Sequence, residues 1–289
     1  MIDEFLRDGY LKVKRSCGSD WKSDQAEEAI HELAANSLRL LSDQCELIDL
    51  VSRVSGKHYI SFRKGAVVAR PANQQHFIAD PDEFTRLRSD WLEGAISASN
   101  WERLSYTTAL APCLAMEIAD RQNKKGPATY FECYIGHLFA KTFAVNPTKR
   151  ARLSILDRDV LMTMDFLLDL GERSPKIHLP VKMSTRERVV QAWSHQRLLD
   201  SAYGNGVYRG IMVLFSETKL DSRTLEVIEI CVPDQWLAYQ TLLAQMDRIY
   251  YFDMPERYRA LTTEYPDVIA IKPFGEFFTE TERQAVLRP

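Results

Sequence analysis

The sequence predicts an α/β fold in which a mostly helical N-terminal part precedes a half where strands and helices alternate. Residues 22–56 carry apolar residues at helical spacing: Ala26, Ile30, Leu33, Leu38, Leu41 and Ile48. After residue 128, short β-rich runs appear at about 160–170, 177–182, 210–216 and 224–232. A loop at residues 123–127 separates the two patterns. We therefore expect parts 1–127 and 128–289, either as two domains or as one continuous core.

The N-terminal part is expected to contain one hairpin and further helix. Residues 57–71 alternate between apolar and polar types, with a turn at Lys64 and Gly65. A helix is expected to begin after Asp80, because Pro follows directly and acidic residues occupy the first turn. The helical pattern then continues to about residue 122, and Pro112 predicts a break within it.

The C-terminal half is expected to open with a helix at 129–143. A second helix is predicted at about 184–200, followed by a turn in which Gly204 and Gly206 allow sharp reversal. Two further helical runs, 234–246 and 254–263, are expected after the last predicted strand. Helices interleaved with strands are typical of a sheet that is covered by helices.

Composition excludes several classes of protein. The chain is 45% hydrophobic and 27% charged, as expected of a globular protein. No apolar run approaches the roughly 20 residues that a membrane span needs. The N-terminal MIDEFLRDGY lacks an apolar signal core, so no export is expected. The five cysteines are scattered without a C-x-x-C pair, which argues against zinc and disulfides and favours the cytoplasm.

Positive charge is concentrated in the middle of the chain. Residues 141–200 hold 11 basic and 7 acidic residues, a balance of +4, whereas the whole chain has a net charge of −3. A basic region within an acidic protein is compatible with a confined surface that faces DNA. Ordinary scatter of charges is the alternative interpretation.

The run from Lys182 to His195, KMSTRERVVQAWSH, carries the strongest functional signal. Arg186 and Arg188 stand where a helix is predicted to begin, although the helix dipole is already positive there. They therefore predict a helix end that faces an anion or a row of acceptors. DNA offers both in its phosphates and its guanine edges. Glu187 could instead form a capping box with Ser184, but this would not explain the arginines.

The strands at 160–170 and 177–182 are predicted to form an antiparallel hairpin centred between residues 173 and 174. In that register Asp165 faces Lys182, Leu167 faces Pro180 and Asp169 faces His178. The intervening pairs are all apolar: Phe166 with Val181, Leu168 with Leu179, and Leu170 with Ile177. The register thus leaves Asp165 and Lys182 close together at the open end of the hairpin.

An aspartate beside a lysine at a sheet edge is suited to phosphodiester hydrolysis. Asp165 can bind a divalent cation, preferably Mg²⁺, which prefers oxygen ligands. Lys182 can orient or deprotonate the attacking water and offset charge on the transition state. A cross-strand ion pair on the surface, worth well under ~1 kcal/mol, is the alternative.

Two further residues are candidates for the same site. Glu132 lies beside the apolar stripe of the predicted helix 129–143, on one side with Gly136. It is equally compatible with a favourable interaction between an acid and the start of the helix. His195 shares a helical side with Arg188 and Gln191, and a structural histidine is its alternative interpretation.

Together these residues resemble the PD-(D/E)XK superfamily, and more narrowly the type II restriction endonucleases that recognise CCGG or CC-N-GG sites. Members with CC-N-GG-type sites have a strand ending in V-K, then Ser/Thr, then R-E-R or K-D-R. The resemblance implies a restriction-endonuclease-like core with a central mixed sheet. It implies that Arg186 and Arg188 contact guanines and that Glu187 contacts cytosines. It also implies that Asp165 and Glu132 are the metal ligands, and it covers about residues 129–200 most specifically.

The chain departs from this pattern at two positions. The residue two before the lysine, often acidic in the superfamily, is Pro180. In the subgroup that carboxylate lies about 13 residues after the lysine, where this chain has His195. Either His195 takes that role with another metal geometry, or Asp165 and Glu132 hold a single ion, or catalysis is weak.

The sequence therefore predicts a Mg²⁺-dependent, site-specific endonuclease that cleaves double-stranded DNA at a short (pseudo)palindromic site and leaves 5′-phosphate ends. A homodimer or higher homo-oligomer is expected, because twofold-symmetric sites suit twofold-symmetric proteins. A cognate DNA methyltransferase is the expected functional partner, within the restriction–modification system of a bacterial or archaeal cell. The alternatives are an inactive sequence-specific DNA-binding protein of this fold, a DNA repair nuclease, and an unrelated α/β protein.

Overall fold

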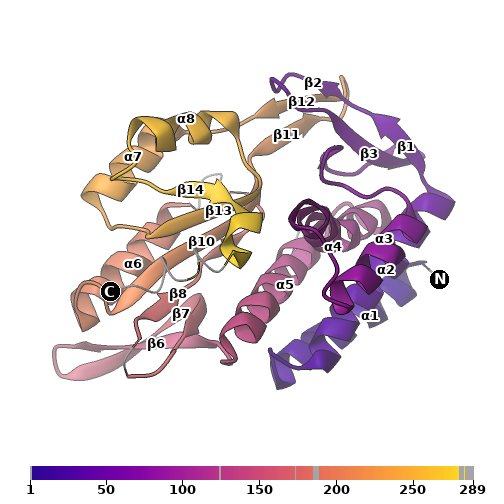
Figure 1. Ribbon diagram of the computed structural model, residues 1–289. Helices are drawn as coiled ribbons and strands as arrows, with labels where there is room; N and C mark the ends of the chain where they lie inside the picture. Colours follow the sequence, from indigo (N-terminus) through magenta and orange to yellow (C-terminus); the bar gives the residue numbers. More distant parts are fainter. Residues whose placement is uncertain (1, 124, 173, 185–188, 280–282, 284–289) are drawn as a thin grey trace. The chain divides into compact units, whose positions relative to one another are not determined.

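The structure is a computed structural model that describes all residues except 1, 124, 173, 185–188, 280–282 and 284–289. The chain divides into two compact units (Figure 1). Unit 1 comprises Met1–His137 and Thr218–Glu229, and unit 2 comprises Leu138–Glu217 and Ile230–Pro289. The boundary therefore lies within helix α5 (Lys125–Phe143). No helix in the described part of the chain is both long enough and apolar enough to cross a membrane.

Unit 1 is built around a group of helices: α1 (Ile2–Ser19), α2 (Asp24–Gln44), α3 (Pro81–Leu92), α4 (Ala98–Ala119) and the first part of α5. The predicted start after Asp80 is confirmed, because the Asp80 side chain accepts a hydrogen bond from a first-turn N–H. The predicted break at Pro112 is wrong. Helix α4 continues through Pro112, which is buried among its neighbours, and the chain breaks instead near Gly94, whose φ is +70°.

The strands of unit 1 are β1 (Glu46–Asp49), β2 (Val51–Ser52), β3 (Tyr59–Lys64), β4 (Val67–Val68), β5 (Ala72–Asn73), β11 (Thr218–Asp221) and β12 (Glu226–Glu229). The hairpin that turns at Lys64 and Gly65 is confirmed. The helix predicted over residues 22–56 is wrong beyond Gln44. There Ile48 and Leu50 are buried while their neighbours are not, and this period of two is that of a strand.

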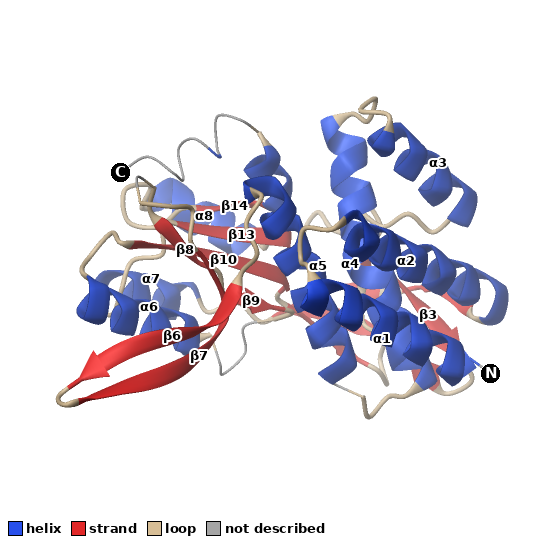
Figure 2. Ribbon diagram, turned by 90° about the horizontal axis from the view of Figure 1, so that it is seen from below, coloured by secondary structure: helices blue, strands red, loops and turns tan. Residues whose placement is uncertain are grey.

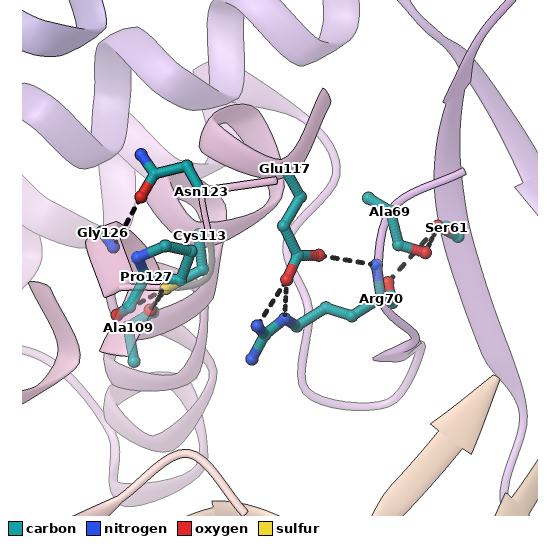
Figure 3. A network of polar contacts seen from close by, with 9 residues as sticks. All are labelled: Ser61, Ala69, Arg70, Ala109, Cys113, Glu117, Asn123, Gly126 and Pro127. Carbon is teal, nitrogen blue, oxygen red and sulfur yellow. Dashed lines mark hydrogen bonds and ion pairs between the residues drawn. The ribbon is translucent and has the colours of Figure 1, made fainter. Parts of the chain in front are cut away.

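An ion pair fastens the β-hairpin of unit 1 to helix α4 (Figure 3). Both oxygens of Glu117 are used, because Oε2 accepts a hydrogen bond from the backbone N–H of Arg70 at 3.0 Å and Oε1 accepts one from its Nε–H at 2.8 Å.

Helix α5 begins earlier than predicted. Asn123 accepts the N–H of Gly126 at 2.9 Å and so caps the start of α5 (Figure 3). The loop predicted over 123–127 is therefore shorter than expected, since α5 already begins at Lys125.

A mixed sheet forms the centre of unit 2, with the strand order β14-β13-β10-β8-β7-β6. The short strand β9 also pairs with β10. Strand β10 is parallel to β13, β8 and β9, whereas β7 is antiparallel to both β6 and β8. The strands are β6 (Thr148–Ile155), β7 (Arg158–Leu168), β8 (Lys176–His178), β9 (Val181–Lys182), β10 (Tyr208–Ser216), β13 (Arg248–Asp253) and β14 (Ile271–Pro273).

The helices of unit 2 are α6 (Val190–Tyr203), α7 (Pro233–Leu242) and α8 (Glu256–Glu264), with the 3-10 helix η2 (Phe274–Phe278). An aromatic core joins them to the sheet. Trp193 of α6 packs edge-on against Trp236 of α7, and Trp236 stacks on Tyr258 of α8. The predicted turn after α6 is confirmed, with φ of +98° at Gly204 and +81° at Gly206. The described part of α6 begins at Val190, later than predicted.

Candidate active site

Asp165 and Lys182 lie in direct contact at the end of strand β9. The Asp165 carboxylate accepts two hydrogen bonds on the same oxygen, Oδ2. One comes from Lys182 Nζ at 2.6 Å and the other from the backbone N–H of Val181 at 3.0 Å. The two side chains are 22% and 23% exposed, so solvent or a ligand can reach the pair. The juxtaposition predicted from the sequence is therefore present.

The predicted register of the hairpin is wrong by two residues. Leu167 faces His178 rather than Pro180, and Asp169, which was predicted to face His178, forms an ion pair with Lys176. The turn sets this register, because Asp169 accepts the N–H of Gly171 at 3.1 Å and Gly171 has a φ of +101°. This hydrogen bond and the positive φ of Gly171 start the turn directly after Asp169, earlier than a turn centred between residues 173 and 174 would.

Asp165 and Lys182 are still in contact because the register differs from the predicted one by an even number of residues. A shift of two residues keeps every side chain on its predicted face. It makes Lys182 a diagonal neighbour of Asp165, a separation that a long side chain can span. Strand β9 then leaves β7 and pairs with β10, where Lys182 lies opposite Leu214.

A buried polar chain lies next to this pair and was not predicted. Gln196 of α6 donates through Nε2 to Asp200 Oδ1 and to the carbonyl of Tyr208, both at 2.9 Å. Its Oε1 is therefore the acceptor for His178 Nδ1, also at 2.9 Å. His178 thus carries its proton on Nδ1. Its Nε2 is buried and has no hydrogen-bond partner in the part of the chain that the structure describes.

Electrostatics link the two histidines to the Asp165–Lys182 pair. Complete burial lowers the pKa of His178 to about 4, with Gln196 opposing the shift. Partial burial also lowers the pKa of His195, while Asp165 raises it and Lys182 lowers it. The two imidazole rings lie 6.3 Å apart, centroid to centroid. The structure therefore brings His195, one of the predicted residues, into the surroundings of Asp165 and Lys182.

One sequence signal could have revealed Gln196. It occupies a buried helical position in line with Ala192, Trp193 and Leu199, where an apolar residue is the norm. A polar side chain in such a stripe requires partners, because an unpaired buried amide is costly. His178 gives the same signal on a short strand between apolar residues.

Of the remaining predicted residues, one belongs to unit 1 and three lie outside the described residues. Glu132 is half-buried on the part of α5 that belongs to unit 1. Glu132 lies close enough to Tyr10 to affect its pKa. Burial is the main cause that raises the pKa of Tyr10, and the charge of Glu132 contributes a smaller part. Its role as a metal ligand stays a prediction. Arg186, Glu187 and Arg188 fall outside the described residues, so their predicted base contacts also stay predictions.

The chemistry of Asp165 fits a magnesium ion. Both of its hydrogen bonds use Oδ2, so within the described residues Oδ1 has no protein partner and is left for another ligand. No cluster of three His, Cys, Asp or Glu side chains with metal-binding geometry occurs among those residues. Mg²⁺ does not need such a cluster, because it is commonly held by one or two carboxylates together with waters and substrate phosphates.

Comparison with known proteins identifies the fold. No family model and no curated protein matches the sequence. The structure is similar to the crystal structure of the type IIP restriction endonuclease Kpn2I, with a TM-score of 0.79 and 24% sequence identity over 96% of this chain and 95% of that one. The chain has a restriction-endonuclease-like fold. The fold class predicted from the sequence is thereby confirmed.

A second solved structure is more distant from this restriction-endonuclease-like chain. It is the complex of restriction endonuclease PspGI with substrate DNA. The TM-score is 0.48 and the identity 16%, over 71% of this chain and 90% of that one.

Proposed function

We propose that this chain is a type II restriction endonuclease that cleaves double-stranded DNA at a short (pseudo)palindromic site containing GG/CC pairs. One observation carries the proposal: Lys182, which ends β9, and Asp165, which lies within β7, are in contact and partly exposed in a restriction-endonuclease-like sheet. The pair Lys176–Asp169 on the same hairpin serves as a comparison. It lies at the turn, where β7 ends and β8 begins, and its side chains are more exposed, at 37% and 58%.

The proposed reaction is hydrolysis that leaves 5′-phosphate and 3′-hydroxyl ends. Asp165 would hold Mg²⁺ through Oδ1, with Glu132 as a second predicted ligand. When bound, the ion supplies positive charge that offsets the negative charge developing on the phosphate. Lys182 has three N–H donors and uses one for Asp165. The other two can hold the attacking water and a phosphate oxygen, which fixes the line of attack and stabilises the transition state.

Sequence recognition is assigned to Arg186, Glu187 and Arg188. A guanidinium can grip the O6 and N7 of guanine with two hydrogen bonds, and a carboxylate can accept from the amino group of cytosine. A homodimer would read the two halves of a symmetric site. A cognate methyltransferase would then protect the host DNA from cleavage in the cytoplasm.

The test is digestion of unmethylated bacteriophage DNA by the purified protein, with Mg²⁺ or with EDTA, followed by sequencing of the fragment ends. Discrete Mg²⁺-dependent fragments that share a GG/CC-containing end sequence are expected. Lys182→Ala should abolish them, whereas Lys176→Ala removes the same charge from the exposed pair on the same hairpin and should leave cleavage intact. Equal activity in both variants would contradict the assignment of Lys182.

One observation favours a second candidate, an inactive DNA-binding protein of the same fold. His195 stands where the subgroup has a carboxylate, and it lies in the electrostatic surroundings of Asp165. A sequence-selective gel shift without cleavage at any Mg²⁺ concentration would support this alternative. Cleavage that depends on DNA structure rather than on a short sequence would instead indicate a repair nuclease.

A further inference from the structure

Helix α6 covers the face of the unit 2 sheet on which Lys182 lies. The helix packs against strands of that sheet, including β6 and β10 (Figure 2). Lys182 is paired with Leu214 of β10, and paired residues on neighbouring strands share a face of the sheet. Leu214 in turn belongs to one buried cluster with Trp193 of α6. Lys182, and with it the carboxylate of Asp165 that it contacts, therefore lies on the side of α6.

His178 lies beneath the same helix. It is paired with Gly210 of β10, and Gln196 Oε1 lies so close to Gly210 that an added Cβ would come within 2.9 Å of it. The same oxygen accepts the hydrogen bond from His178 Nδ1. His195 is the neighbour of Gln196 in α6, and its ring lies 6.3 Å from that of His178. The two histidines therefore lie on the face of the sheet that also holds the candidate active site.

His195 is available as a ligand. It is half-buried, and its ring nitrogens have no hydrogen-bond or ion-pair partner in the part of the chain that the structure describes. Burial lowers its pKa, so the ring is neutral at pH 7 and one of its nitrogens carries a lone pair. Asp165 raises and Lys182 lowers the same pKa, which shows that the ring lies near both charges. An ion bound to Asp165 is therefore close to a free imidazole nitrogen.

His178 provides a second, independent sign of a ligand at this place. Its side chain is fully buried, and because Nδ1 carries the proton, Nε2 presents a lone pair. Nε2 has no hydrogen-bond partner among the described residues. Buried acceptors are normally satisfied, by water or an ion where the protein supplies no donor. Water on a bound cation is a strong donor, because the positive charge makes its protons more acidic.

Asp165 and His195 offer donor atoms of different kinds. Asp165 Oδ1 is a hard oxygen without a partner among the described residues, whereas His195 offers an imidazole nitrogen. Mg²⁺ prefers ligand sets composed of oxygen. First-row transition-metal ions bind imidazole well, and their affinity for a given site rises from Mn²⁺ through Co²⁺ to Cu²⁺. The mixed set therefore favours a transition-metal ion over Mg²⁺.

We propose that His195, together with Asp165, is a protein ligand of the ion in the candidate active site, and that this nitrogen–oxygen site prefers a first-row transition-metal ion to Mg²⁺. The inference rests on the proposed function and specifies the ion of that site. Both residues belong to unit 2, so the packing of one helix on one sheet holds them together. Mg²⁺ in excess can still bind through Asp165 and water, and the Mg²⁺-dependent cleavage proposed above is expected to remain.

The test is titration of the full-length, untagged protein with Co²⁺ and, separately, with Mg²⁺, in the absence of DNA. Isothermal titration calorimetry measures both affinities. Proton NMR detects the exchangeable N–H of an imidazole bound to paramagnetic Co²⁺, because that resonance is shifted far downfield. The wild type should show this resonance and bind Co²⁺ at least ~10-fold more tightly than Mg²⁺.

His195→Ala should lose the resonance and bind Co²⁺ at least ~10-fold more weakly, because even the outer partners of a metal ligand contribute about 10–100-fold. Its affinity for Mg²⁺ should change by less than about threefold, since Mg²⁺ makes little use of nitrogen. In His195→Glu, an oxygen donor replaces the nitrogen. The resonance should disappear, and the preference for Co²⁺ over Mg²⁺ should fall below that of the wild type.

His58→Ala is the control for the loss of a histidine elsewhere. His58 is exposed and belongs to unit 1, so this variant should keep both affinities and the resonance of the wild type. Thermal unfolding checks that each variant is folded. If His195→Ala is not, His195→Gln, which keeps a polar side chain of similar length, takes its place in the same titrations.

Each outcome decides the question. Wild-type affinity for Co²⁺ with an unchanged resonance in the folded His195 variant overturns the inference, and so does a wild type that binds Mg²⁺ as tightly as Co²⁺. Mg²⁺-dependent cleavage by the wild type then leaves the proposed function standing. Co²⁺ binding and a resonance that persist in Asp165→Asn also overturn the inference, since the ion then lies elsewhere. A wild type that binds neither ion and cleaves no DNA overturns the proposed function as well.

Discussion

Replacing Gln196 by leucine should destabilise unit 2 strongly, although the substitution nearly conserves volume. Gln196 is 1% exposed and joins three partners: His178 of β8, Asp200 of α6 and Tyr208 of β10. Leucine cannot replace any of these hydrogen bonds. The His178 Nδ1–H and the carbonyl of Tyr208 would lose their partner in a place that water does not reach.

The expected loss follows from the number of groups left unpaired. Each buried donor or acceptor without a partner costs about 1–3 kcal/mol. His178 and Tyr208 therefore predict a loss of about 2–6 kcal/mol. Asp200 adds little, because it is only partly buried and can bond to water instead. The gain from burying a leucine offsets part of the loss, which places the expectation in the lower half of that range.

Urea unfolding monitored by intrinsic fluorescence measures this difference. The matched control is Gln191→Leu, the same exchange at an exposed position of the same helix, which should change the free energy of unfolding by no more than ~0.5 kcal/mol. If Gln196→Leu lost no more than Gln191→Leu, the polar chain from Asp200 to His178 would be absent from the protein in solution.

Two further predictions concern other buried positions. Burial lowers the pKa of His31 to about 3, so below its ordinary 6.5 the unfolded chain takes up a proton that the folded chain does not. The free energy of unfolding should fall by about 2.3 kcal/mol between pH 6.5 and 4.5 through this group. The urea midpoint should depend less on pH across that range in His31→Leu than in the wild type. His58→Leu, at an exposed site, should keep the pH dependence of the wild type. In Gly210→Ala the new Cβ would meet the sulfur of Met246 at 2.5 Å, so this variant should lose about 1–3 kcal/mol of stability and unfold at a lower temperature. Gly18→Ala has open space around its Cβ and should keep the thermal midpoint of the wild type.

Local signals predicted the elements that depend on local chemistry. Asp80 caps its helix, Gly65 turns the first hairpin and Gly204 ends α6, as their sequence positions indicated. The errors arose where tertiary packing decided the outcome. Pro112 should break a helix in water, yet it lies inside the almost continuously buried α4, where packing offsets the missing hydrogen bond.

Strand β6 was missed although its pattern is present in the sequence. Ala151 and Leu153 are 2% exposed each and alternate with exposed residues, which is the period of a half-buried strand. The exposed positions include Arg150 and Arg152, and no element was predicted between the helix at 129–143 and the strand at about 160.

The contact between Asp165 and Lys182 was predicted better than the strand pairing that was used to predict it. The hairpin register was wrong by two residues, yet Asp165 and Lys182 still meet. The two residues meet because a register shift by an even number of residues leaves each side chain on the same face of its strand. An odd shift would have placed Lys182 among the apolar residues of the opposite face, where an unpaired ammonium is prohibitively costly. Burial of that face therefore restricts the hairpin to registers that keep the two charges on one side, and the length of the lysine side chain makes the remaining difference of two residues unimportant.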